Sequence, residues 1–84
     1  MSATFSYVLT TRSKGPEGRG KPVVHKTIEN ASEPPLEQGE LLAVELGEDV
    51  DIHAHNEWWS PVYTCLPDGR IWRHASGRKQ GWVK

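Results

Sequence analysis

Two adjacent tryptophans beside carboxylates are the residues whose types and spacing best suit a binding chemistry. Trp58 and Trp59 follow Glu57 directly in the run NEWWSPVYTCL. Because successive side chains of a strand point to opposite faces, one indole is expected inside and the other at the surface. An exposed indole can stack on a proline ring or a cation, and nearby carboxylates can pair with Lys or Arg. The pattern predicts a site for a basic or proline-containing peptide, and two purely structural tryptophans are the alternative.

A His-Ala-His triplet is the second candidate. On a strand, His53 and His55 share one face at a separation of about 7 Å. Two such imidazoles can hold Zn²⁺ or another transition metal, with His25 or His74 as a third ligand. The same face carries Asp51 and is the polar face by alternation, so a solvent-facing row is the simpler interpretation. We therefore predict no metal and no cofactor, and a metal- or small-ligand-binding barrel at this pair is an alternative.

Basic residues suggest a nucleic-acid surface as a further alternative. The glycine-rich stretch 15–21 has the spacing of a phosphate-binding loop, but Pro22 stands where that motif needs Ser or Thr before a helix, so we reject a nucleotide site. Cations interleaved with aromatic residues can still bind a phosphate backbone. The residues of this alternative are Arg12, Lys14, Arg19 and Lys21 in one loop and Arg70, Arg73, Arg78 and Lys79 near the C-terminus.

Catalytic groups are not evident in the sequence. Cys65 is the only cysteine, so it cannot form an intramolecular disulfide. It lies in an apolar run, where buried and unreactive thiols are usual. Carboxylates are numerous, but no pairing marks one of them as a general acid or base. We predict a non-enzymatic protein.

Charge falls into three blocks, although the net charge is only −1. Residues 1–28 carry five Lys or Arg and one Glu, and residues 58–84 carry five Lys or Arg and one Asp. The acidic segment between them, residues 29–57, carries nine carboxylates and no Lys or Arg. Pairing of this segment with its basic neighbours is one interpretation. Recruitment of a basic partner by an acidic face is the other.

Strands must position most of these residues. Alternation and β-branched residues predict strands over 3–11 and 23–28, which form an N-terminal hairpin around a flexible loop at 12–22. A second flexible loop is predicted at 29–40, where two prolines oppose regular structure. The remaining predicted strands, separated by turn residues, cover 50–55, 58–66, 70–74 and 82–83.

The run LLAVEL at 41–46 fits two structures. Its residues can alternate between the two faces of a strand. A short helix over 35–46, starting near Pro35 and ending at Gly47, is the alternative. We favour the strand because Gly39 weakens a helix.

Residues 47–83 resemble the core of a small SH3-like barrel, including the bacterial SH3 kind. The residues that carry this likeness are Gly47-Glu48-Asp49-Val50-Asp51-Ile52, Asn56-Glu57-Trp58-Trp59, Asp68-Gly69-Arg70 and Gly81-Trp82-Val83. The resemblance implies a strand after an acidic loop, a Trp pair that opens the next strand, a turn, and a closing Gly-Trp-Val. It also implies that Trp58 is the exposed member of the pair and meets the ligand.

The sequence therefore predicts one small domain over residues 1–84, mainly β, built as an SH3-like barrel or a curled antiparallel sheet. Trp59, Trp72 and Trp82 are expected in the core. No run approaches the roughly 18 apolar residues of a membrane span, so we expect a cytoplasmic protein without a membrane partner. We predict a protein-binding or adaptor module whose partner is a protein, a peptide or a second copy of the chain. Its predicted ligand face comprises Trp58, Glu57, Asp49, Glu48 and Tyr63.

Overall fold

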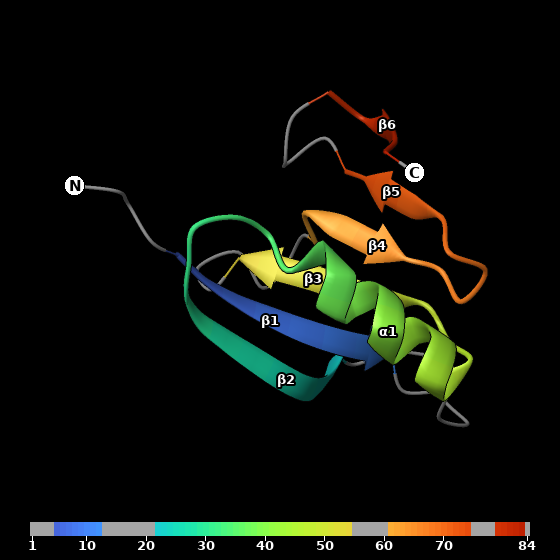
Figure 1. Ribbon diagram of the computed structural model, residues 1–84, viewed down its shortest axis with the longest axis horizontal. Coiled ribbons are helices and arrows are strands. Elements are labelled where there is room, and N and C mark those ends of the chain that lie inside the picture. The colour runs from blue at the N-terminus through green and yellow to red at the C-terminus, as the bar shows by residue number, and fades with distance from the viewer. Residues whose placement is uncertain (1–4, 13–21, 55–60, 75–78, 84) are drawn as a thin grey trace.

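One antiparallel sheet with one helix across it makes up the described part of the chain. The computed structural model describes residues 5–12, 22–54, 61–74 and 79–83, and Figure 1 shows α1 lying over one face of the sheet. The strand order is β2-β1-β3-β4-β5-β6, and all neighbouring strands are antiparallel. The elements are β1 (Phe5–Arg12), β2 (Pro22–Ala31), α1 (Leu36–Leu46), β3 (Val50–Ala54), β4 (Tyr63–Cys65), β5 (Ile71–Arg73) and β6 (Gly81–Trp82).

The mainly-β prediction and the N-terminal hairpin are confirmed. The second strand of the hairpin is longer than expected, because β2 continues to Ala31. Of the two predicted arrangements, the open sheet is the one found: β2 and β6 are the outer strands and do not pair with each other in the described part of the chain. The sheet is therefore not closed into a barrel, and the SH3-like resemblance stays a prediction.

The helix α1 replaces the strand that we favoured at 41–46. Pro35 stands at its N-cap, and Gly47 ends it in the left-handed conformation, where the Gly47 N–H donates to the carbonyl of Ala43 at 2.8 Å. Leu, Glu, Gln and Ala between these ends are strong helix formers. The helix turns its smallest residues, Gly39 and Ala43, toward the sheet, where both are buried. Strand-like alternation was misleading because close packing on small residues decides the structure of this segment.

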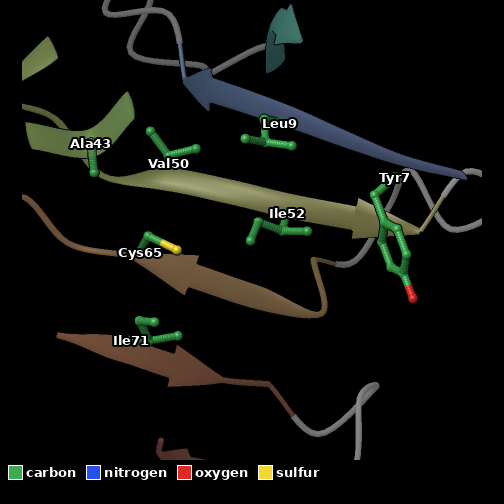
Figure 2. Packing of buried hydrophobic residues seen from close by; sticks show 7 residues of the cluster. All are labelled: Tyr7, Leu9, Ala43, Val50, Ile52, Cys65 and Ile71. Carbon is green, nitrogen blue, oxygen red and sulfur yellow. The ribbon is translucent and has the colours of Figure 1, made fainter. Parts of the chain in front are cut away.

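The hydrophobic core lies between α1 and the sheet. Figure 2 shows its side chains pointing from neighbouring strands toward the helix side, where Ala43 meets them. Leu9, Val50 and Ile52 are fully buried there. The seven residues of the core cluster are Tyr7, Leu9, Ala43, Val50, Ile52, Cys65 and Ile71.

Strand register assigns other side chains to the far face of the sheet, away from α1. Asp51 pairs with Thr10 on β1 and with Thr64 on β4. Thr64 pairs with Trp72 on β5, and Trp72 pairs with Trp82 on β6. Directly paired residues point to the same face, and the residues on either side of Asp51 point into the core. All five side chains therefore belong to the far face.

The strand β2 forms a long but irregular edge of the sheet. His25 is an extra residue between the partners of Leu9 and Thr10, and Asn30 has a φ of 57° at a second irregularity. Bulges and an exposed lysine such as Lys26 oppose the pairing of an edge strand with another chain.

As for membranes, the described residues include no helix with the length and apolar character that a bilayer span needs.

Candidate functional site

A chain of polar contacts crosses the far face of the sheet. The Nε of Arg12 lies 3.6 Å from Oδ2 of Asp51. The hydroxyl of Thr64 donates to Oδ1 of Asp51 at 2.7 Å, and its oxygen lies 2.7 Å from Nε2 of His74. Asp51 is only 8% exposed. We call Arg12, Asp51, Thr64 and His74 the polar chain.

The hydrogen bonds of the polar chain place a proton on Nε2 of His74. The Thr64 hydroxyl has one hydrogen, and this hydrogen is given to the carboxylate of Asp51. Nε2 of His74 must therefore be the donor to the Thr64 oxygen, and a neutral ring already supplies that proton. Burial lowers the pKa of His74; the Asp51 carboxylate opposes this effect, whereas Arg12 and His53 add to it.

We expect the protein to lose stability as the pH falls from 7.5 to 5.5. The unfolded state has the ordinary His pKa of 6.5 and the folded state a lower one, so acid protonates the unfolded chain first and favours it. The loss of stability begins near the pKa of His74 in the unfolded chain and is complete below its pKa in the folded protein. Urea midpoints across this range measure it. His74→Gln keeps a donor to Thr64 and should flatten the slope, whereas His25→Gln, at the exposed β2 edge, should not; equal slopes in all three proteins would contradict the assignment.

The predicted solvent-facing row of Asp51 and His53 is wrong, because both side chains are buried. Neighbouring strands supply hydrogen-bond partners, which lets the polar groups lose contact with water. His53 is 5% exposed, and its Nε2 lies 3.1 Å from the hydroxyl of Thr10 on the neighbouring strand. Alternation along a single strand identified the shared face but carried no information about what covers it.

The metal alternative gains no support from the described residues. They contain no group of three His, Cys, Asp or Glu side chains placed to hold a metal ion. The two proposed third ligands are engaged elsewhere, because Nε2 of His25 lies 2.7 Å from the Thr11 hydroxyl and His74 belongs to the polar chain. His55 lies outside the described residues, so the pair with His53 stays a prediction.

The predicted ligand face is divided between two clefts. Glu48 and Asp49 line a cleft of about 490 Å³ at the C-terminal end of α1, together with Arg12, Asp51 and Thr64. Tyr63 instead lines a cleft of about 620 Å³ near Pro34, Pro35 and the start of α1. Glu57 and Trp58 lie outside the described residues. The structure thus brings two predicted acidic residues together and places Tyr63 apart from them.

Several carboxylates of the acidic segment are not paired with the basic residues that the structure describes. Five of them are exposed and have no ion-pair partner among the described residues: Glu29, Glu33, Glu37, Glu45 and Asp49. Asp51 is the carboxylate of the segment that pairs with Arg12. Between the two interpretations of the charge pattern, the exposed carboxylates favour an acidic face.

The two most exposed apolar side chains of α1 lie within this acidic surface. Leu41 is 65% exposed and Val44 is 62% exposed. Leu41 lies one helical turn from both Glu37 and Glu45. We call these four residues the outer face of α1. The strand prediction for 41–46 concealed it, although a helical projection of the same residues would have placed Leu41 and Val44 together.

The C-terminal end of α1 concentrates the negative charge further. The last turn contains no basic residue. Glu45 lies in this turn, and Glu48 and Asp49 follow it. The end of a helix itself carries a partial negative charge from unpaired carbonyls, so cations are the favoured neighbours there. The last turn of α1 itself therefore supplies no basic side chain that would stabilise this end.

Trp82 is not the core residue that we predicted. It is 54% exposed, because β6 is a short edge strand and packs against β5 on one side only. Its ring meets the half-buried Trp72 edge to face, with centroids 5.0 Å apart and planes at 78°. The guanidinium of Arg70 lies 4.8 Å from the Trp82 ring centroid and also pairs with Asp68 at 2.7 Å. We call Trp72, Trp82 and Arg70 the tryptophan patch.

The basic residues of the nucleic-acid alternative are only partly brought together. Arg70, Arg73 and Lys79 lie around β5 and β6, where Nε of Arg73 donates to the carbonyl of Lys79 at 2.8 Å. Arg12 lies on β1, which β3 and β4 separate from β5. The other predicted members, Lys14, Arg19, Lys21 and Arg78, lie outside the described residues.

Cys65 lies in the core, as an unreactive thiol would. Its Sγ is buried against the helix side of the sheet. Burial raises its pKa to about 12, and the carboxylates of Glu40 and Asp51 contribute to this shift. A thiol that stays protonated is a poor nucleophile.

Comparison with known proteins adds no relative. No protein-family model matches the chain, and neither the curated proteins nor the solved structures contain a match.

Proposed function

We propose that this protein is a non-enzymatic protein-binding module whose outer face of α1 docks a cationic, amphipathic segment of another protein. The observation that carries the proposal is the exposure of Leu41 and Val44 beside Glu37 and Glu45, which have no ion-pair partner in the described part of the chain. Apolar side chains of this size are normally buried, and adjoining exposed ones mark interaction sites. Glu57 and Trp58 remain predicted members of the binding surface.

Charge complementarity supports a basic partner. Glu37 and Glu45 flank Leu41 on the helix, and Asp49 extends the negative charge beyond the helix end. Lysines or arginines of a partner would pair with these carboxylates and stabilise the helix end at the same time. Apolar residues spaced one turn apart on the partner would cover Leu41 and Val44.

A second copy of the chain fits this surface poorly. Two outer faces of α1 would place glutamates against glutamates, and like charges in contact are destabilising. The bulged edge at β2 also opposes pairing between sheets. We therefore commit to a basic protein segment rather than to a homodimer.

We expect a fluorescently labelled, amphipathic helical peptide made of Leu and Lys to bind the outer face of α1. The Leu/Glu peptide, which has Glu in place of each Lys, should not bind. Leu41→Ala with Val44→Ala should weaken binding by about tenfold or more, because the double change removes several methylene groups from the contact at roughly 0.8 kcal/mol each when fully buried. Glu37→Lys with Glu45→Lys should weaken it through charge reversal. Fluorescence anisotropy measures each affinity.

The matched control is Val24→Ala, which truncates an apolar side chain that is 49% exposed on β2. It should leave the affinity unchanged, and circular dichroism should show that all variants are folded. Equal binding of the Leu/Glu peptide would overturn the proposal. So would a dimer in sedimentation that the Leu41→Ala/Val44→Ala variant dissociates, because α1 would then be covered by a second copy.

A further inference from the structure

We propose that the tryptophan patch is a separate binding site for single-stranded nucleic acid. Trp82 offers a stacking surface for one base, and Arg70 and Lys79 supply positive charge for the phosphates around it. This site does not rest on the proposed function, because it lies on the other face of the sheet and involves none of the residues of α1.

The geometry presents one indole for stacking. Trp82 is more than half exposed, while its contacts with Trp72 and Arg70 hold the ring in position. Because the two indole planes are nearly perpendicular, they cannot both stack on consecutive parallel bases. One base on Trp82 is therefore the expected contact. Bases of any sequence stack on exposed aromatic rings, which makes such sites sequence-tolerant.

The charge around the patch suits a phosphate backbone. Arg70 touches the Trp82 ring, and the exposed Lys79 lies two residues before the first residue of β6. Arg73 adjoins Trp72 on β5, so its side chain belongs to the helix side of the sheet, and its Nε donates to the Lys79 carbonyl. Asp68 is the carboxylate beside Arg70. Among the described residues, Arg70 over the ring and Lys79 before β6 are thus the cations available to this site.

The sheet separates this site from the acidic segment on α1. Trp72 and Trp82 share the far face with Thr64, whereas the outer face of α1 lies beyond the opposite face. Asp51 is on the far face too, where it is buried and paired with Arg12, and Glu48 and Asp49 line a cleft with it. The carboxylates on the outer face of α1 are therefore kept away from a phosphate backbone bound at Trp82.

The test is binding of fluorescein-labelled oligo-dT and oligo-rU, followed by anisotropy. Two phosphate contacts on a single strand, with a slope of about −0.7 each, predict a roughly 7-fold loss of affinity between about 50 mM and about 200 mM salt. Trp82→Ala should weaken binding by about 5- to 150-fold, the range for loss of one base–aromatic stack. Trp82→Phe keeps a ring and should retain most of the affinity.

Two charge variants separate a site from general attraction. Arg70→Gln should reduce the salt slope by about 0.7, because it removes one phosphate contact. Lys26→Gln removes one charge from the opposite edge strand and should change nothing. The proposal is overturned if neither oligonucleotide binds at about 50 mM salt, if Lys26→Gln weakens binding as much as Arg70→Gln, or if Trp82→Phe loses as much affinity as Trp82→Ala. Binding of a proline-rich peptide to Trp82 without oligonucleotide binding would also overturn it, since the ring would then serve a protein partner.

Discussion

Replacing Gly39 with valine is expected to destabilise the protein by at least about 3 kcal/mol, a large part of the total stability of a domain of this size. A Cβ at this position would lie 2.8 Å from Sγ of Cys65 and 3.0 Å from Cδ1 of Ile52. Both neighbours are fully buried, so neither can move aside freely. Valine adds two further methyl groups where the first carbon already has no room. Urea unfolding followed by tryptophan fluorescence and circular dichroism measures the loss.

Leu41→Val is the matched control, because it places the same side chain on the exposed side of the same helix. It should cost no more than about 0.5 kcal/mol, the difference in helix propensity. Gly39→Ala should destabilise the protein less than Gly39→Val does. Combining Gly39→Val with Cys65→Ala should recover part of the lost stability, because it removes the sulfur atom nearest to the added Cβ. A Gly39→Val protein as stable as the parent would show that the helix does not pack this closely on β3 and β4.

The native Cys65 thiol is expected to react with iodoacetamide about a thousandfold more slowly than the same thiol in urea at pH 8. Burial and the nearby carboxylates raise its pKa from 9.0 to about 12, which lowers the thiolate fraction by about that factor. Mass spectrometry after timed quenching follows the reaction. Ser32→Cys in a Cys65→Ser background places a thiol at an exposed position and should react at the ordinary rate.

The same pKa shift has a consequence at high pH. The folded state holds its thiol proton up to about pH 12, whereas the unfolded chain loses it near pH 9. Stability is therefore unaffected by this group below pH 9 and falls as the pH rises beyond it. Gly39→Ala should speed the labelling of Cys65. The added Cβ would lie too close to the sulfur, so the helix must shift away from the thiol that it covers. Rapid labelling of the native parent protein would contradict the buried position.

Local patterns were sufficient for most of the strands. Val50 and Ile52 alternate with Asp51 and His53, and this alternation is the one that β3 shows. Turn residues at 67–69 correctly separated β4 from β5. The segment 41–46 failed because its apolar residues fit either period, and the choice depends on a contact between Gly39 and residues far along the chain.

The candidate surfaces were less accessible to the sequence than the strands. The acidic segment was evident from charge alone, but its exposed apolar residues Leu41 and Val44 required the helix. Trp82 was expected inside because a large aromatic residue normally is. Its exposure depends on β6 being the last strand of an open sheet.

Composition and periodicity alone establish a small, mainly β protein with an acidic middle segment and its tryptophans toward the C-terminus. These properties depend only on each residue and its near neighbours in the sequence. Which faces these residues occupy was decided by the tertiary structure. Strand pairing places Asp51 against Thr10 and Thr64, so a polar row became buried. The helix over one face and the open edge at β6 then leave Leu41, Val44 and Trp82 in solvent. Burial depends on neighbours that are distant in sequence, and local periodicity holds no record of them.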